Sequence, residues 1–269
     1  MNLDAYFKRI GYVGGREASL DVLRDLHIHH TQAIAFENLS PYLKLDMALD
    51  PDALFDKLVH RRRGGYCYEQ NGLFKHVLDA LGFSTRSLAA RVRLNVPEER
   101  KTARTHMLLL IEIGPERYIA DVGFGGLTLT APIRLISDIA QETPHGLYRL
   151  TESGDEFVLS TEVGEIWKTL YTFNLAEHSM PDYELMNWYT STNPRSIFVN
   201  NLIAARPVRD GRHILLNNRY SFRGLSGVEG EQTIGTVAEL KELLFNVFGI
   251  EVPNVPDADQ MLARALSAD

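Results

Sequence analysis

The sequence contains a single cysteine, Cys67, among 269 residues. One thiol cannot form an internal disulfide or a thiolate metal cluster, and sparse cysteine is typical of proteins in a reducing compartment. The sequence also lacks an apolar run of about 18 residues, so we expect no transmembrane helix. Residues 1–15 lack the apolar segment of a signal peptide. These absences predict a cytoplasmic protein with no metal site.

Basic charge is also scarce. The chain has 28 Lys and Arg against 35 Asp and Glu, a net charge of −7. Because nucleic-acid binding needs a basic face against the phosphates, this balance argues against a nucleic-acid partner. The remaining composition, 45% hydrophobic and 23% charged, is that of a globular protein long enough for more than one domain. Internal repeats and low-complexity segments are missing too, which excludes a solenoid.

The first 83 residues are predicted to be mostly helical. Ser19 precedes leucines at helical spacing, and Asp50 before Pro51 is a good N-cap with proline at the first helical position. A third amphipathic pattern follows Cys67 and ends at Gly82. Cys67 is therefore expected just before or within the first turn of a helix.

From residue 84 the pattern changes to strands separated by Gly, Pro and Asp turns. After residue 183 a connecting helix, a strand at 213–224 and an amphipathic helix capped by Thr236 are predicted. Because a run of strands follows a run of helices, the fold class is α+β, layered or divided into domains. The strands are expected in five stretches, 84–95, 105–114, 116–125, 147–163 and 165–174.

The lone cysteine has two interpretations. The ordinary one is a small buried hydrophobe. The other is a nucleophile, because the positive end of a helix favours a thiolate. Gly64 and Gly65 let the chain turn sharply there, and the preceding arginines add positive potential.

A nucleophilic thiol needs a base, and the base needs a group that orients it. Among nine histidines, His27 and its neighbours 29 and 30 lie in a polar helical stretch and are expected to be exposed. His106 opens an apolar strand that a Gly-Pro-Glu turn joins to the strand before Asp121. Pairing across that turn would bring His106 near Asp121, which could accept its Nδ1–H. A core histidine and a turn-forming aspartate remain the ordinary alternative.

Six segments together are similar to one known family. Over most of the chain the sequence resembles a bacterial-type arylamine N-acetyltransferase. The segments are FENLSPY at 36–42, RRRGGYCYEQNGLF at 61–74, RVRLN at 91–95, THMLLL at 105–110, ADVGFGG at 120–126 and STNPRSIFVNNLIAAR at 191–206.

The resemblance implies a three-part fold with a cysteine-proteinase-like core. It assigns a helical domain with Cys67 to 1–83, a β-barrel-like domain with His106 and Asp121 to 84–183, and a connecting helix with an α/β lid to 184–269. It also implies ping-pong acetyl transfer. Acetyl-CoA would acetylate Cys67, and an arylamine, arylhydroxylamine or arylhydrazine would take the acetyl group, with no tightly bound cofactor.

Residue roles follow from the same resemblance. Cys67 is the expected nucleophile, His106 its base and Asp121 the orienting acid. Glu37 and Arg63 form a buried structural pair. The glycine turn at 123–126 and amides near Cys67 are candidate oxyanion donors. The expected substrate-binding residues, several of which are equally compatible with core packing, are Phe36, Tyr68, Val92, Thr105, Gly123, Phe124, Gly125 and Phe198.

Two other functions stay open at this stage. A thiol hydrolase or amidase would use the same three residues and pass the acyl group to water. A biosynthetic amide synthase of the same superfamily would pass it to an internal amine. In every case the partners are small molecules, and the protein is expected to be a monomer or a homodimer.

Overall fold

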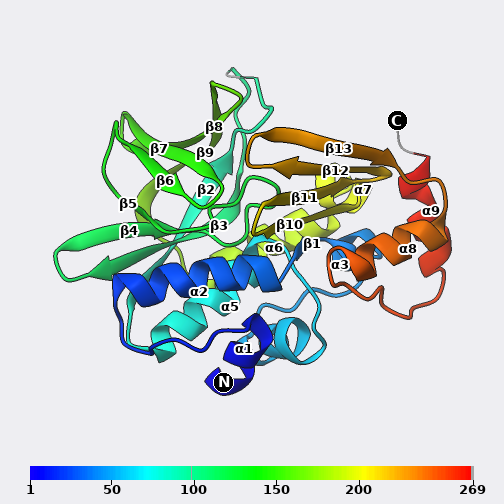
Figure 1. Cartoon of the computed structure of the whole chain (residues 1–269), viewed down its shortest axis with the longest axis horizontal. Coiled ribbons are helices and arrows are strands. Elements are labelled where there is room, and N and C mark those ends of the chain that lie inside the picture. The colour runs from blue at the N-terminus through cyan, green and yellow to red at the C-terminus, as the bar shows by residue number, and fades with distance from the viewer. Residues whose placement is uncertain (98, 268–269) are drawn as a thin grey trace.

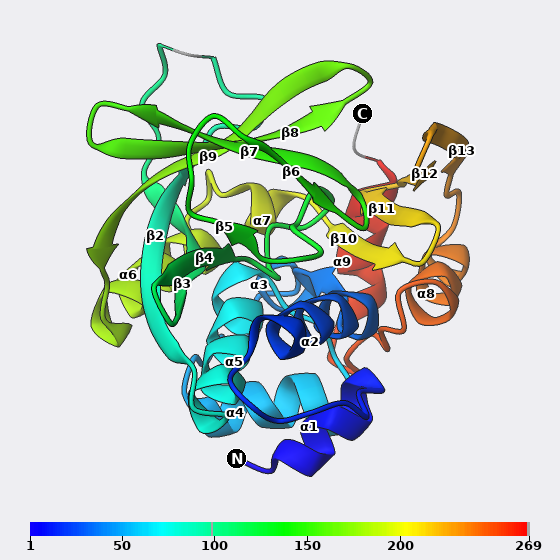
Figure 2. The same ribbon diagram turned by 60° about the vertical axis from the view of Figure 1, so that its left-hand side comes forward.

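The computed structural model describes residues 1–97 and 99–267, in which a helical layer supports two β-sheets (Figure 1). Figure 2 shows the larger sheet wrapping above the helices, with the smaller sheet beside it. The α+β class predicted from the sequence is confirmed. No helix in these two ranges is long and apolar enough to cross a membrane.

The helical layer begins where the sequence predicted. The side chain of Ser19 accepts from the amide of Val22, and that of Asp50 accepts from Ala53, so both predicted N-caps are confirmed. Helix α4 does not continue as a plain α-helix but passes into the π-helical turn η1. The elements are α1 (Leu3–Ile10), α2 (Leu20–Ala33), α3 (Leu39–Tyr42), α4 (Pro51–Phe55), η1 (Asp56–His60) and α5 (Cys67–Ala80).

The larger sheet has eight strands in the order β5-β4-β3-β2-β9-β8-β7-β6 and nearly closes into a barrel. The side-chain amide of Gln141 bonds the backbone N–H and carbonyl of Arg134, which links the two edge strands. The strands are β2 (Ser84–Val92), β3 (Arg104–Ile113), β4 (Glu116–Ala120), β5 (Ile133–Arg134), β6 (Ala140–Thr143), β7 (Gly146–Ser153), β8 (Glu156–Val163) and β9 (Ile166–Glu177).

The smaller sheet has the order β1-β10-β11-β12-β13. Its first strand, β1 (Phe36–Glu37), comes from the N-terminal part of the chain and pairs with β10, so segments far apart in sequence share one sheet. The other strands are β10 (Ile203–Val208), β11 (Gly211–Leu216), β12 (Arg219–Gly224) and β13 (Gly227–Thr233).

Two stretches expected as single strands are hairpins. The stretch 147–163 is divided into β7 and β8 by a turn in which Gly154 has φ +64°. The stretch 213–224 is divided into β11 and β12 at Asn217, with φ +56°. Glycine and asparagine reach this left-handed region at low cost, which is why the chain reverses there.

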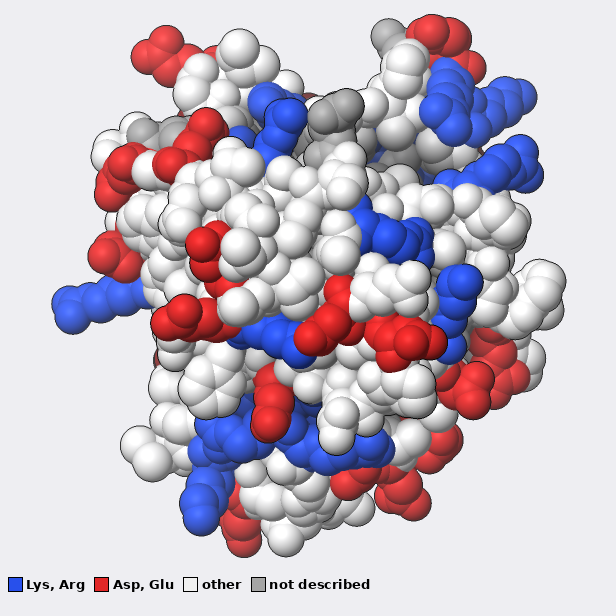
Figure 3. Space-filling view, turned by 90° about the vertical axis from the view of Figure 1, so that its right-hand side faces the viewer, with Lys and Arg blue, Asp and Glu red and all other residues white. Residues whose placement is uncertain are grey.

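Four helices complete the chain. They are α6 (Met180–Thr192), α7 (Ile197–Asn200), α8 (Val237–Asn246) and α9 (Ala258–Leu266). The predicted cap of α8 is confirmed, because the Thr236 side chain accepts from the Glu239 amide. Helices α8 and α9 cover the smaller sheet on the side shown in Figure 3, where acidic and basic side chains intermix.

The core beneath the larger sheet positions the chemistry. Apolar side chains of α2 and α5 pack in one buried cluster against the faces of β3 and β4 that point away from the barrel interior. Phe74 of α5 and Leu109 of β3 are both inaccessible to solvent. Cys67 belongs to the same cluster, so the beginning of α5 is held against the sheet by burial on every side.

Candidate active site

Cys67 is the first residue of α5, as predicted. The helix begins there because Glu69, in the first turn, accepts the backbone N–H of Tyr66 at 3.1 Å, one half of a capping box. The segment before it lies against β1, where a Cβ on Gly64 would come within 2.2 Å of the Ala35 carbonyl oxygen. Only glycine permits this approach. The thiol is thus aimed from a rigid helix N-terminus and is 3% exposed.

Asp121 lies just beyond the end of β4 and is fully buried. Its Oδ1 accepts from the side-chain amide of Asn71 and from the backbone N–H of Gly123, both at 2.9 Å. Its Oδ2 accepts from the Tyr171 hydroxyl at 3.0 Å and lies 2.7 Å from Nε2 of His106. Burial alone would raise the pKa of Asp121, but the charge and hydrogen bond of His106, with the donors Asn71 and Gly123, hold it below its usual value.

His106 comes from β3, and its ring lies between aromatic neighbours. The centroids of Tyr171 and Phe124 are 4.9 and 5.2 Å away. Burial alone would lower the pKa of His106, but the charge and hydrogen bond of Asp121, with a hydrogen bond to Cys67, raise it to about 10. A protonated imidazole beside the sulfur is the form that this environment favours.

The orientation of His106 differs from the expectation. Nε2, not Nδ1, faces the carboxylate of Asp121. Nδ1 is therefore the ring nitrogen left for Cys67. His106 lies three residues before Leu109, whose pair with Ala120 is the last of the β3–β4 ladder, so its ring approaches Asp121 from beyond the paired part of these strands.

The turn after Asp121 packs directly on the cysteine. A Cβ on Gly123 would lie 2.8 Å from the Cα of Cys67, so only glycine fits. Thr105 contributes its carbonyl oxygen, 3.8 Å from the sulfur. Three separate segments of the chain, around residues 67, 105 and 123, thus converge within contact distance.

The glycine turn supplies fewer oxyanion donors than expected. The N–H of Gly123 donates to Asp121, and the N–H of Phe124 donates to the hydroxyl of Thr128 at 3.2 Å. Both amides are already used inside the turn. The first-turn amides of α5 are the donors that a helix N-terminus leaves available.

The aromatic candidates fall into two groups. The ring centroids of Phe36 and Phe198 lie 6.1 Å apart, and those of Phe198 and Tyr66 lie 5.4 Å apart. Gly125 faces the Phe36 ring, since a Cβ there would be 3.5 Å from it. Phe124, on the other side, packs against His106. These rings surround the cysteine segment from two sides.

The other two candidates are placed less directly. The Tyr68 ring is buried between Tyr66 and Tyr183, and its hydroxyl lies 3.5 Å from Thr190 of α6. The hydroxyl therefore belongs to the contact between α5 and α6. Val92 is half-buried at the end of β2, where it pairs with Tyr171 of β9.

Glu37 and Arg63 meet as the resemblance implied. Nε and Nη2 of Arg63 lie 3.0 and 2.7 Å from Oε1 of Glu37, whose side chain is inaccessible. Burial would raise the pKa of Glu37, but the charges of Arg63 and Lys57 lower it. A second ion pair lies beside the first: Nζ of Lys57 is 2.5 Å from Oε1 of Glu69. It anchors the side chain that caps α5 next to Cys67.

Three residues of the site were not found from the sequence. Asn71 joins Asp121 to the Met107 carbonyl, and its position four residues after Cys67, one helical turn, was a usable signal. Tyr171 had no local signal, because it reaches Asp121 only through the curvature of the sheet. His27 accepts the backbone N–H of Asp121 at 3.2 Å. It and His30 are fully buried, so the expectation that they are exposed was wrong.

Metal ligands do not gather anywhere in the described ranges. No group of three or more His, Cys, Asp or Glu side chains there could hold an ion.

The sequence and the fold were compared with known proteins. A family model described as N-acetyltransferase matches residues 19–256. The arylamine N-acetyltransferase of Escherichia coli (strain K12) is 44% identical over 251 residues, which cover 93% of this chain and 89% of that protein. A Salmonella typhimurium protein named arylamine N-acetyltransferase / N-hydroxyarylamine O-acetyltransferase is 42% identical and covers 94% and 90%.

Solved structures agree with the sequence comparison. The Mycobacterium marinum arylamine N-acetyltransferase in complex with CoA matches with a TM-score of 0.94 at 40% identity, covering 99% of each chain. Identity at this level over nearly the whole length of both chains carries the family assignment as well as the fold. The resemblance read from the six segments is confirmed, and the chain belongs to the arylamine N-acetyltransferase family.

Proposed function

We propose that this protein transfers the acetyl group of acetyl-CoA to arylamines through an acetyl-Cys67 intermediate. The observation that carries the proposal is the buried group of Cys67, at the N-terminus of α5, with His106 and Asp121 beside it. Its use of acetyl-CoA is supported by the relative solved with CoA. The name of the Salmonella relative supports arylhydroxylamines as further acceptors, with oxygen as the acetylated atom.

The first half-reaction begins from a thiolate and an imidazolium. The Cys67 sulfur attacks the carbonyl carbon of acetyl-CoA, and first-turn amides of α5 stabilise the oxyanion that forms. When the carbon–sulfur bond to CoA breaks, Nδ1 of His106 gives its proton to the leaving thiolate. The products are acetyl-Cys67, neutral His106 and CoA.

The second half-reaction reverses the proton movement. The amine nitrogen attacks acetyl-Cys67, and neutral His106 takes the proton that the nitrogen loses. Cys67 leaves as the thiolate, which restores the starting ion pair. Asp121 stays ionised throughout and stabilises the imidazolium form of His106. An aromatic amine suits this step because it is neutral near pH 7 and fits flat aromatic walls such as Phe124, Phe36 and Phe198.

The three-part division is the structural side of the proposal. Residues 1–83 would supply the nucleophile, 84–183 the histidine and aspartate, and 184–269 a lid over the acceptor. The hydrogen bonds of Asn38, from its side-chain amide to the carbonyls of Phe198 and Asn201, support a lid tied to the helical part. In the roles proposed for Cys67, His106 and Asp121, the core resembles that of a cysteine proteinase.

Intact-mass measurement tests the intermediate. The protein is incubated with acetyl-CoA and no acceptor, and an arylamine is then added. The expected result is a mass gain of one acetyl group on Cys67, absent in Cys67→Ala and lost when the arylamine arrives. Loss of the acetyl group to water at the same rate without the amine would contradict transfer and favour the hydrolase. No acetylation of a folded, thiol-reactive protein would exclude acetyl-CoA as the donor.

A further inference from the structure

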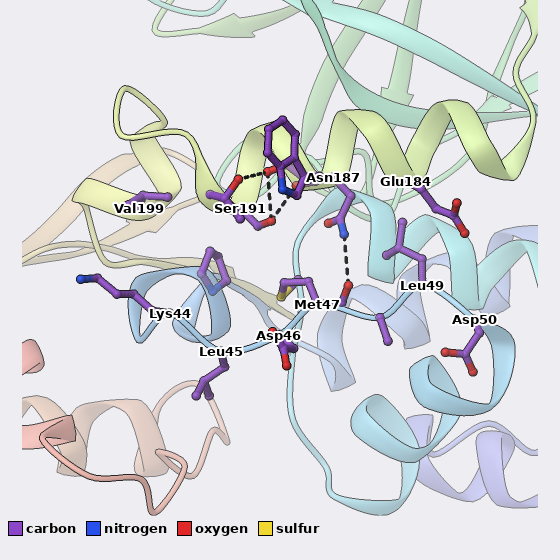
Figure 4. Close-up of a pocket in the computed structure, with 14 residues that line it drawn as sticks. Lys44, Leu45, Asp46, Met47, Leu49, Asp50, Glu184, Asn187, Ser191 and Val199 are labelled. Atoms are coloured by element: carbon purple, nitrogen blue, oxygen red, sulfur yellow. Dashed lines mark hydrogen bonds between the residues drawn. The ribbon is translucent and has the colours of Figure 1, made fainter.

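A cavity of about 780 Å³ lies between α6 and the loop that joins α3 to α4. Its volume is within the range of about 300–1,000 Å³ that small-molecule sites occupy. Neither Cys67, His106 nor Asp121 lines it. Figure 4 shows Glu184 and Asn187 extending from α6 toward the loop, and Met47 and Leu49 extending from the loop toward the helix.

One wall of the cavity is fixed by hydrogen bonds. Asn187, which is buried, accepts the hydroxyl of Tyr66 at its Oδ1 and donates from Nδ2 to the carbonyl of Met47 at 3.3 Å. Tyr66 is itself buried as the cap of α5. The loop and α6 are therefore held at this separation through a residue anchored in the protein core. These hydrogen bonds preorganise one wall of the cavity.

Charge in the cavity is mostly negative. Its lining contains three acidic residues, Asp46, Asp50 and Glu184, and one basic residue, Lys44. No ion pair in the described ranges engages these three carboxylates, although Asp50 caps α4. Figure 4 places Glu184 and Asp50 at one end, beside Leu49, while Lys44 points away at the other.

We propose that this cavity binds a small organic cation, a protonated amine on an apolar body. The ammonium would lie by Glu184 and Asp50, and the apolar body would cover Met47 and Leu49. The charge requirement separates this ligand from the acceptor of the transfer reaction, since an arylamine is neutral near pH 7 and a protonated alkylamine is not nucleophilic. The proposal does not depend on the acetyl transfer proposed above.

Equilibrium dialysis tests the charge requirement. Phenylethylamine is cationic at pH 7, and phenylethanol is its neutral match. We expect saturable binding of one amine per chain, at least about tenfold tighter than the alcohol. Glu184→Gln with Asp50→Asn should weaken the amine by about fivefold or more, because each exposed ion pair is worth up to about that factor, and asparagine at position 50 can still cap α4. The control Glu242→Gln removes an exposed carboxylate from α8 instead and should change nothing.

A fluorescence experiment locates the ligand. Trp188 lines the cavity, and Trp167 is the other tryptophan of the chain. In a Trp167→Phe background, Trp188 should report binding with the same midpoint as dialysis. Equal binding of the alcohol, no saturable binding, or binding that ignores both the carboxylate substitutions and Trp188 would overturn the proposal.

Discussion

The buried histidine of β3, His106, and the buried histidines of α2, His27 and His30, have pKa values that are shifted in opposite directions. His106 meets the carboxylate of Asp121, and its pKa is raised. His27 meets the backbone N–H of the same residue, and burial, which outweighs the Asp121 charge, lowers its pKa to about 3. His30, bonded to the Tyr6 hydroxyl and the Gln70 side chain, has its pKa lowered by burial to about 4.

Burial is equal in the two regions, so it does not decide the outcome. A ring nitrogen that faces a carboxylate gains from a proton, whereas one that accepts an N–H would lose its hydrogen bond on protonation. The helical layer therefore keeps neutral histidines as structural acceptors. Strand β3 carries the histidine whose pKa is raised, and the charged form that this favours is the form that a thiolate needs beside it.

The largest loss of activity is expected when the carboxylate of Asp121 is replaced. In Asp121→Asn, His106 would face a neutral partner, as His27 does, and the imidazolium would no longer be stabilised. We expect the initial rate of CoA release with an arylamine to fall by about 10⁴-fold. Thermal unfolding of the same variant checks that the fold survives. A rate within about tenfold of the parent would show that the charge of Asp121 is not what distinguishes His106.

The ion pair of Glu37 and Arg63 shows a buried carboxylate whose partner is permanently charged. Glu37 faces Arg63, which cannot release a proton, so this pair is expected to hold structure rather than move protons. Arg63→Leu would leave a buried carboxylate without its cation and should lower the free energy of unfolding by about 3–5 kcal/mol. Urea denaturation measures it.

The matched control for that pair is the double replacement. Arg63→Leu with Glu37→Gln removes both charges and should recover much of the loss, because well-packed neutral groups often substitute for a buried pair. A single variant that costs under about 1 kcal/mol would place the pair among weak surface contacts instead.

Acid should reveal the neutral histidines. The folded-state pKa values of His27 and His30 lie near 3 and 4, below the ordinary 6.5. Between these folded-state values and about pH 6.5, the unfolded chain therefore binds more protons than the folded chain. The stability they contribute is complete above about pH 6.5 and declines as the pH falls toward 4. His106, with its raised pKa, contributes in the opposite sense, and its share declines as the pH rises toward about 10.

Urea midpoints measured from about pH 7 down to pH 5 test this dependence. His30→Asn, which can still accept from Tyr6 but cannot take a proton, should show a shallower decline than the parent. An unchanged slope would mean that other groups control the acid limb.

The smallest effect is expected from Tyr171→Phe. The change removes one of the donors to Asp121 and leaves the carboxylate, its other partners and the aromatic packing in place. We expect the transfer rate to fall by about tenfold, which corresponds to about 1.5 kcal/mol, the lower end for a single hydrogen bond to a charged group. With less stabilisation of the carboxylate, the pKa of His106 should rise and shift the pH–rate profile upward. A loss as large as that of Asp121→Asn would make the hydroxyl an equal partner.

Local patterns were enough to predict much of the site. Ser19, Asp50 and Thr236 begin helices for reasons contained in the next three residues. The meeting of His106 with Asp121 followed from one hairpin, since a short turn determines which residues pair. The position of Cys67 at a helix N-terminus was local too. Capping, turn chemistry and hairpin register act over a few residues, so one stretch of sequence contains them.

The candidates Cys67, His106 and Asp121, the helix beginnings and the family could therefore be predicted from the sequence. What surrounds those three residues depends on the tertiary structure. Tyr171 reaches Asp121 across 50 residues, and Asn187 reaches Tyr66 across 121, because a curved sheet and a packed helix bring them there. It also decided that His27 is buried and neutral while His106 is charged. Contacts of this range depend on how whole layers pack, and no local pattern records that packing.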